Sequence, residues 1–372
     1  MNATDRPESG GTPGDGGIAT TVREARLCQL LPRADGDAVA AAAILAGACD
    51  AADTPYHVSA IRTREGLRSR LASADPDADA VVIGARAPEQ PALSGSSASR
   101  EAHEVASALG VSPDPALALA GVVAAGADPA DATPGLLERA DAEPVAGVAI
   151  PTDDAADGLA HTTLAHAAVS GKRERVVEEL DGLGADPDPR DVASLLALAV
   201  AGSDGATARS ATAVERAIHP YRIPGPFRTV GGYADVLSAL ARRAPGLALA
   251  LAMTGEGREA ALSAWRERAV RTHDAVRSAE TARYDGLTVA RIDGPVAPTA
   301  RLLRDFRSPE PGVLAVGDGE AAIATVSTGA GDAIEAAAEA AGDSGLGRED
   351  RGYARFEPER TDAFVDAARG AL

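Results

Sequence analysis

The sequence has almost no lysine, few aromatic residues and only two cysteines. Lys172 is the single lysine, so the other 35 of its 36 Lys and Arg residues are arginine. Aromatic residues make up 3% of the chain. Cys28 and Cys49 both stand among apolar residues, a setting typical of buried, reduced thiols. The cysteines therefore predict neither a disulfide framework nor a metal-binding pair.

Several signals of function are also absent. No apolar run approaches the roughly 20 residues that a membrane-spanning helix needs, and no secretory signal is recognised. We therefore expect a cytoplasmic protein with no membrane partner. The chain contains no GxxxxGKS/T loop, no HExxH, no CxxC and no GxSxG. P-loop, zinc-protease and serine-hydrolase mechanisms consequently have no support.

The charge is strongly acidic, with a formal net value of −19. Abundant Asp and small apolar residues favour a protein that works in concentrated salt, where a hydrated acidic surface maintains solubility and screening removes self-repulsion. Nucleic-acid binding is not excluded by this charge, because counterion release contributes little in molar salt. Binding would then depend on stacking, hydrogen bonds and shape.

The chain divides into a leader, a large domain, a long helix and a small domain. Gly, Pro, Thr and Asp dominate the start of the chain, which predicts a disordered leader over residues 1–21. Residues 22–255 begin with buried-strand patterns and continue into a mostly helical middle section. Residues 256–286 indicate one linker helix, and 287–372 a domain of its own. The predicted fold class is α/β: a parallel-sheet domain with a helical middle section, then a linker helix and a smaller α/β C-terminal domain.

The stretch 29–49 organises the first domain. The apolar run 27–31 predicts a buried strand, and the small residues of 38–48 predict a helix after a polar turn. Asp35 lies in that turn, at the carboxyl end of the strand, where open α/β sheets bind ligands. Its carboxylate is a candidate metal ligand or base, and Asp37 is a weaker candidate. The alternative is that Asp35 caps the following helix.

This stretch resembles the first motif of the DHH phosphoesterases, the family that includes the RecJ single-strand exonucleases. In that motif a strand ends in His-x-Asp-x-Asp-Gly before a small-residue helix. With Gly36 as the anchor, Leu31 stands in place of the His. Arg33 replaces the first Asp, and Asp35 matches the second. Gly84 stands where the family has another metal-binding Asp, and the Asp-His-His triplet is missing. The resemblance implies the family's fold with degenerate metal motifs.

The resemblance extends to the end of the chain. It implies that residues 22–255 are a DHH-like domain and that residues 287–372 are a DHH-associated domain. Gly231 and Gly232 are similar to a glycine pair that precedes a helix near the RecJ cleft. Their loop could present backbone N–H groups to an anion, and a tight connector is the alternative.

Four arginines of the C-terminal domain are further candidates for binding nucleic acid or phosphate. Arg348 stands where the family's Gly-Gly-His loop has its histidine, and Arg351 follows it closely. Arg304 and Arg307 are expected to face the cleft. A guanidinium suits phosphate because its donors form a planar fork. Alternatively, the first two are solvated charges that answer neighbouring carboxylates.

The resemblance implies a link to single-stranded DNA or RNA in DNA replication or repair, with replisome proteins as possible partners. Because the metal motifs are degenerate, we expect a non-catalytic protein without a cofactor. The alternative is an active single-strand exonuclease or oligonucleotide phosphodiesterase that uses Asp35 and Asp37 with Mn²⁺ or Mg²⁺. A module that only binds a phosphate ligand is the third hypothesis.

Overall fold

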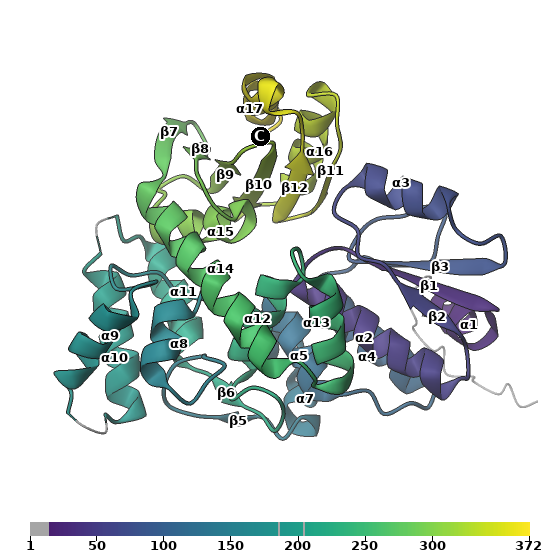
Figure 1. The fold of residues 1–372 in the computed structure, drawn as a ribbon, viewed down its shortest axis with the longest axis horizontal. Helices are drawn as coiled ribbons and strands as arrows, with labels where there is room; N and C mark the ends of the chain where they lie inside the picture. Colours follow the sequence, from purple (N-terminus) through teal and green to yellow (C-terminus); the bar gives the residue numbers. More distant parts are fainter. Residues whose placement is uncertain (1–14, 185–186, 204) are drawn as a thin grey trace, which may run out of the picture.

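The first sheet consists of four parallel strands. The computed structural model describes residues 15–184, 187–203 and 205–372 (Figure 1). Strand β1 (Leu27–Pro32) lies between β2 (Tyr56–Val58) and β3 (Ala78–Ile83), and β4 (Ala92–Leu93) pairs with the outer edge of β3. Parallel strands are covered on both faces and carry nearly continuous apolar runs. The predicted strand 27–31 is confirmed for this reason.

Helices cover both faces of this sheet. On one face, α2 (Gly36–Ala51) packs against α4 (Ala98–Ala108) and α5 (Pro115–Ala124), and it is buried along nearly its whole length. Its alanines allow close approach, because a Cβ atom added to Gly121 of α5 would lie only 3.1 Å from the Cβ of Ala40. On the other face, α3 (Arg64–Ala72) lies toward the C-terminal domain (Figure 1).

The expected leader is shorter than predicted. Residues 1–14 lie outside the described part of the chain, but residues 15–21 belong to helix α1 (Asp15–Glu24). Ile18 and Val22 of this helix are completely buried and join the core of the first domain. The two apolar side chains, four positions apart, share one helix face, so even a Gly-rich segment gains enough burial to fold.

The middle section is mostly helical, as predicted. Its elements are α6 (Pro129–Ala132), α7 (Pro134–Arg139), β5 (Glu143–Pro144), α8 (Ala155–His161), α9 (Arg173–Asp181), α10 (Pro189–Ala201), α11 (Ala208–Ile218), β6 (Tyr221–Arg222), α12 (Val230–Leu240) and α13 (Pro245–Thr254). The helix expected after Gly231 and Gly232 includes both glycines and begins at Val230, because the Thr229 hydroxyl accepts a hydrogen bond from the N–H of Gly232 at 3.0 Å. Helix α13 was not expected from the sequence.

The linker helix is also shorter than predicted. Helix α14 spans Arg258–Ser278, and residues 280–284 form strand β7 (Glu280–Tyr284) instead of its last turns. Strand β7 pairs with β8 (Leu287–Arg291) across the two-residue turn Asp285-Gly286. Asp-Gly is a strong hairpin signal because its second residue adopts positive φ, here 76°.

The C-terminal domain contains a six-stranded mixed sheet in the order β11-β12-β10-β9-β8-β7. Its other elements are α15 (Val296–Phe306), β9 (Gly312–Val316), β10 (Glu320–Thr325), α16 (Ala330–Ala340), β11 (Gly345–Arg348), β12 (Arg351–Arg355), a 3₁₀ turn (Pro358–Arg360) and α17 (Thr361–Gly370). Only β8 and β9 pair in parallel, with α15 as the crossover between them. The predicted α/β class is confirmed for the molecule as a whole.

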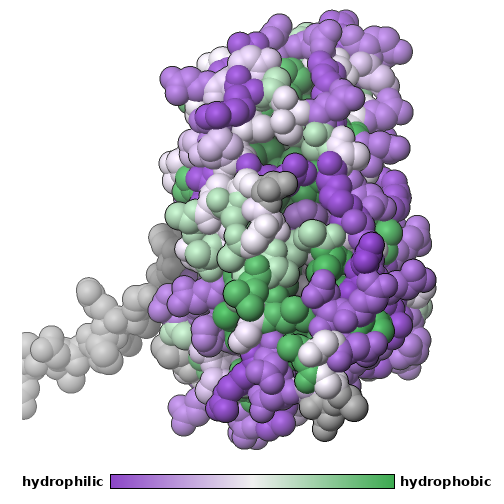
Figure 2. All heavy atoms as spheres, turned by 90° about the vertical axis from the view of Figure 1, so that its left-hand side faces the viewer, coloured by the Kyte–Doolittle hydropathy of each residue, from purple (hydrophilic) through white to green (hydrophobic). Residues whose placement is uncertain are grey.

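The C-terminal domain shares a hydrophobic core with the middle section. Val214 of α11 belongs to the same cluster as Leu303 and Phe306 of α15. On the outside, hydrophobic residues gather at the centre of the face that includes α9 and α10, between hydrophilic ones (Figure 2). Leu198 of α10 is 72% exposed. Within the described residues, no helix combines the length and apolar character that crossing a bilayer requires.

Candidate functional site

A cleft of about 950 Å³ lies between the first domain and the C-terminal domain. Its walls come from the turn after β1, the end of α5, and helices α12, α14 and α15, together with β10 and β12. The carboxyl end of β1 therefore opens into it, which is the usual ligand position in open α/β sheets. Small apolar side chains and arginines form much of the lining.

Asp35 caps helix α2 at this cleft. Its carboxylate accepts a hydrogen bond from the N–H of Ala38 at 3.0 Å and one from Nε of Arg33. Burial alone would raise the pKa of Asp35, but the Arg33 charge and these hydrogen bonds hold it below its usual value. The helix-cap interpretation thus describes the contacts of Asp35, and its charge is neutralised by a neighbouring guanidinium.

Asp37 lies in α2, but its carboxylate caps the start of α4. Its side chain accepts hydrogen bonds from the backbone N–H groups of Ala98 (2.8 Å) and Ser99 (2.9 Å) and from the hydroxyl of Ser97 (3.0 Å). These are donors at the start of α4 that have no partner within the helix. Burial and the nearby charge of Asp35 raise the pKa of Asp37. Its oxygens are therefore engaged in fastening α4 to α2.

Arg33 lies at the strand ends, where the related motif has an Asp. Its side chain is 9% exposed, and its backbone N–H donates to the carbonyl of Ile83 at 2.8 Å. Gly84 adopts a φ of +77°, and a Cβ atom there would lie 3.0 Å from the Cβ of Ala38 and 3.5 Å from that of Arg33. The guanidinium thus lies beside the position of the missing Asp.

These groups do not fit a divalent ion as they are arranged. Mn²⁺ and Mg²⁺ need several converging oxygen or imidazole ligands. Asp35 is paired with a cation, Asp37 is fully hydrogen-bonded, and residue 84 has no side chain. Among residues 15–184, 187–203 and 205–372, no three His, Cys, Asp or Glu side chains converge.

Arg348 and Arg351 connect the C-terminal domain to the first domain. Arg351 donates to the carbonyls of Ala124 (3.1 Å) and Ala125 (2.6 Å) at the end of α5. Arg348 donates to the carbonyl of Ser96 at 3.0 Å. Asp350 forms ion pairs with both arginines, at 3.0 and 2.9 Å. Their donors are thus largely used within the protein, although Arg351 also lines the cleft.

Arg304 and Arg307 lie in different places. Arg304 lines the cleft, where it pairs with Asp305 at 2.7 Å and donates to the carbonyl of Thr325 at 2.8 Å. Arg307 is not among the cleft residues. It donates to the carbonyl of Val276 at 2.7 Å, near the end of α14, where a cation is favoured by the helix dipole.

Gly231 and Gly232 form part of the first turn of α12, and both are buried. A Cβ atom at Gly232 would lie 2.3 Å from the backbone of Ile150, and one at Gly231 would lie 2.8 Å from the Cβ of Ala149. Close packing therefore requires both glycines. Gly231 also lines the cleft, but the N–H of Gly232 already bonds to Thr229.

Four cleft arginines were not expected from the sequence: Arg216, Arg242, Arg268 and Arg301. Arg268 follows Trp265 by three positions, on a helix face where Trp265 and Ala269 are completely buried. An arginine on an otherwise apolar helix face is a sequence pattern that could have indicated a cleft residue. Burial, and then the charges of Arg242 and its neighbour Arg243, lower the pKa of Arg268 to about 10.

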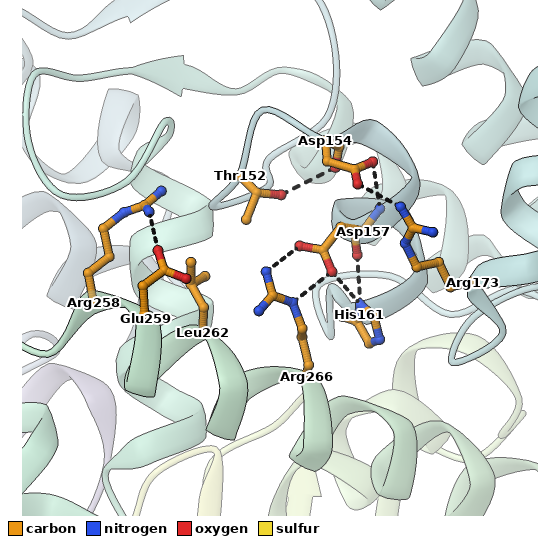
Figure 3. Close-up of a pocket in the computed structure, with 9 residues that line it drawn as sticks. All are labelled: Thr152, Asp154, Asp157, His161, Arg173, Arg258, Glu259, Leu262 and Arg266. Carbon is orange, nitrogen blue, oxygen red and sulfur yellow. Dashed lines mark hydrogen bonds and ion pairs between the residues drawn. The ribbon is translucent and has the colours of Figure 1, made fainter.

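A second pocket, of about 470 Å³, lies between α8 and α14 (Figure 3). Its charged side chains point toward one another. Asp157 accepts two hydrogen bonds from Arg266, at 2.8 and 2.9 Å, and lies 3.0 Å from Nδ1 of His161. Asp154 pairs with Arg173 at 2.8 Å. This network connects α8 to α9 and α14, and both Asp154 and Asp157 are ion-paired within it.

Comparisons with known proteins connect this architecture to relatives. The family model "Uncharacterized protein rrnAC1427, C-terminal domain" matches residues 279–370. The uncharacterized protein rrnAC1427 of Haloarcula marismortui is 42% identical over 386 residues, which cover 100% of both chains. Among solved structures, CDC45 from Entamoeba histolytica is 11% identical with a TM-score of 0.58, covering 96% of this chain and 97% of that one.

RecJ from Thermus thermophilus in complex with Mn²⁺ aligns over 96% of this chain and 54% of its own, at 14% identity and a TM-score of 0.46. The likeness to CDC45 along nearly the whole of both chains supports the expected RecJ-like DHH fold, and at this identity it concerns the fold alone. With a relative 42% identical over its full length, the chain belongs to the family of the Haloarcula marismortui protein rrnAC1427.

Proposed function

We propose that this chain binds single-stranded nucleic acid in its cleft without cleaving it, as a cytoplasmic RecJ-like protein of DNA replication or repair. The ion pair between buried Arg33 and half-buried Asp35, at the end of β1, is the observation that carries the proposal. A guanidinium keeps its charge at any physiological pH. It therefore places a fixed positive charge where a catalytic cation would have to bind.

The magnitude of this effect follows from Coulomb's law. At about 4 Å, with an effective dielectric constant of about 20, a divalent ion is attracted by one carboxylate by roughly 8 kcal/mol and repelled by one guanidinium by about the same amount. The Arg33–Asp35 pair as a unit therefore offers Mn²⁺ or Mg²⁺ almost no net attraction. Two-metal hydrolysis needs two such ions about 3.5–4 Å apart, so the proposal includes no metal-dependent step.

The composition of the cleft supports the binding of a nucleic acid. The chain has a net charge of −19, yet the lining contains seven arginines against seven Asp and Glu residues. Apolar side chains such as Val123, Leu164 and Ile323 occupy other parts of the lining. Guanidinium groups suit phosphates. Tyr221 and Tyr353 also line the cleft, and aromatic rings beside positive charge are the combination that single-strand binding uses.

A digestion assay in high salt tests the absence of cleavage. We expect no degradation of a labelled (dT)₂₀ strand with Mn²⁺ or Mg²⁺, no tight Mn²⁺ binding by calorimetry, and retention of the intact strand in an anisotropy measurement. Mn²⁺-dependent degradation that Asp35→Ala abolishes, and that Asp366→Ala at an exposed position of α17 leaves unchanged, would promote the exonuclease alternative. If the wild-type protein neither retains nor degrades the strand, the nucleic-acid function itself is refuted.

We also propose that the partners include replisome proteins, for which the likeness to CDC45 in fold is the support. Pull-down from a native lysate at molar KCl tests this part separately. Recovery of replication proteins with the wild-type chain is the expected result. Recovery of only unrelated proteins would contradict the assignment to replication and leave the binding assay as an independent test of the cleft.

A further inference from the structure

Three half-buried arginines of the cleft form no ion pair with a carboxylate in the described part of the chain. Arg242 follows α12, Arg268 lies in α14, and Arg301 lies in α15, and all three line the same cavity. Of the other cleft arginines, Arg33, Arg304 and Arg351 are ion-paired with neighbouring aspartates, and Arg216 is exposed and donates to the carbonyl of Gly126 at 3.1 Å. Among the half-buried arginines of the cleft, guanidinium groups without an ion-paired carboxylate are therefore these three.

Arg242 has an unsatisfied donor in a fixed orientation. Its guanidinium lies over the ring of Tyr353, with 3.7 Å between the Cζ atom and the ring centroid. Nη1 is buried and has no hydrogen-bond partner among the described residues. A buried donor without a partner is costly, and for a charged group more so. A ligand that accepts this hydrogen bond would remove the penalty.

Arg301 is held in place by a buried polar network. Its Nη2 donates to the carbonyl of Thr163 at 2.7 Å. The N–H of Thr163 donates to Asp235 at 2.9 Å, and Asp235 also accepts a hydrogen bond from the indole N–H of Trp265 at 3.0 Å. Arg301 is thereby positioned before any ligand arrives, and the chain's only tryptophan lies two hydrogen-bonded residues away from it.

We propose that Arg242, Arg268 and Arg301 form a binding site for the phosphate group of a nucleotide or oligonucleotide. The inference rests on the proposed function, and it names the residues that carry it. Phosphate oxygens accept the forked donors of guanidinium groups and supply the negative charge that the three side chains lack. The apolar walls beside them would receive the attached sugar and base. An inorganic anion alone would leave these walls unused.

Burial also explains why the site is made of arginine. Desolvation lowers the pKa of all three guanidinium groups, in the case of Arg268 to about 10. An arginine remains charged after such a shift at neutral pH, whereas lysine loses its proton more readily when buried. The site therefore stays cationic without an ion pair, and it is available to an anionic ligand.

Titrations followed by the fluorescence of Trp265, in molar KCl, test the site. The probes are dTMP, pyrophosphate and (dT)₁₀, and calorimetry gives each dissociation constant independently. We expect dTMP and (dT)₁₀ to bind more tightly than pyrophosphate. Arg242→Gln and Arg268→Gln should each weaken binding about tenfold or more, since each removes a charge-assisted hydrogen bond. Arg291→Gln removes the same charge from an exposed position outside the cleft, and it should leave binding unchanged.

Thermal unfolding separates a binding role from a structural one. A purely structural arginine would lower the melting temperature of the free protein when replaced. A ligand-binding one should leave it unchanged or raise it, because an uncompensated buried charge is removed. Unchanged affinity for every probe in both variants, or an equal loss in Arg291→Gln, would overturn the site.

The probes also distinguish the site from the proposed function. Arg242-dependent binding of dTMP without binding of (dT)₁₀ would support the site and refute the single-strand function. Binding of (dT)₁₀ that neither variant weakens would leave the function standing and overturn this site.

Discussion

Lowering the pH should destabilise this protein through two buried histidines between α14 and the turn after α8. His166 and His273 stack with ring centroids 5.2 Å apart, and their Nδ1 atoms are 3.0 Å apart. Nε2 of His273 lies 3.1 Å from the carbonyl oxygen of Thr162 and must donate to it. In the neutral ring its Nδ1 is then an acceptor, so His166 carries the proton between the rings. Both histidines are neutral in this arrangement.

Burial lowers the pKa of His166 to about 4, and the charges of Arg277, Arg307 and Lys172 act in the same direction. Burial and the proximity of His166 also lower the pKa of His273. The unfolded chain takes up a proton near pH 6.5, whereas folded His166 does so only near pH 4. The contribution of neutral His166 to the free energy of unfolding is therefore fully present above pH 6.5, and it is lost as the pH falls from about 6.5 to 4. A shift of this size corresponds to roughly 3 kcal/mol of unfolding free energy.

Urea unfolding at molar KCl, followed by Trp265 fluorescence from pH 7.5 to 4, measures this loss. Carboxylates also titrate in the range, so the informative quantity is the difference between wild type and His166→Gln. That difference should shrink by about 3 kcal/mol over the window, because the variant has only a pH-independent packing loss. His57→Gln, at an exposed site, should run parallel to wild type. Parallel curves for wild type and His166→Gln would refute the reasoning.

The remaining predictions concern stability. Asp37→Ala removes the acceptor of three donors around the start of α4, so the free energy of unfolding in urea should fall by roughly 3 kcal/mol. The control Asp366→Ala changes a side chain that is 74% exposed, and it should alter the free energy of unfolding by less than about 0.5 kcal/mol. Gly232→Ala would place a Cβ atom 2.3 Å from the backbone of Ile150, so it should lower the free energy of unfolding by about 3 kcal/mol or prevent folding. A Cβ atom at Gly246 would meet open space, so Gly246→Ala should leave the free energy of unfolding nearly unchanged. The melting temperature should rise steadily from dilute buffer to molar KCl, because the net charge of −19 repels itself when unscreened; a melting temperature independent of salt contradicts this expectation.

Local patterns predicted the first sheet well and the end of the linker helix poorly. The apolar run 27–31 and the helix after it depend on neighbouring residues alone, so periodicity was sufficient to place them. Residues 279–285 contain Glu, Thr, Ala and Arg, which continue a helix pattern, and the prediction overlooked the Asp285-Gly286 turn. Pairing of β7 with β8 outweighs a weak local preference for helix.

The site could be predicted only in part, because its contacts join residues that are distant in sequence. The position of Asp35 after a strand predicted that it would lie at a cleft, and it does. Its pairing with Arg33 depends on rotamers that spacing does not reveal. Arg242 and Tyr353 are stacked although more than 100 residues separate them in the sequence, and no local pattern connects them. Arg348 and Arg351 were predicted as phosphate ligands from motif position, whereas their carbonyl partners belong to another domain.

The way in which Arg348 and Arg351 join the two domains has a consequence for the working range of the protein. Their partners in the first domain are backbone carbonyls of Ser96, Ala124 and Ala125, which are neutral groups that ions do not neutralise. Arg351 contacts two of these carbonyls and Asp350 at once, which the forked donors of arginine permit and the single ammonium of lysine does not. Salt should hardly weaken these contacts, in contrast to the Arg64–Glu335 ion pair (2.7 Å) that also joins the two domains. Part of the connection between the domains is therefore expected to persist at any ionic strength, even where the stability of the whole chain depends on salt.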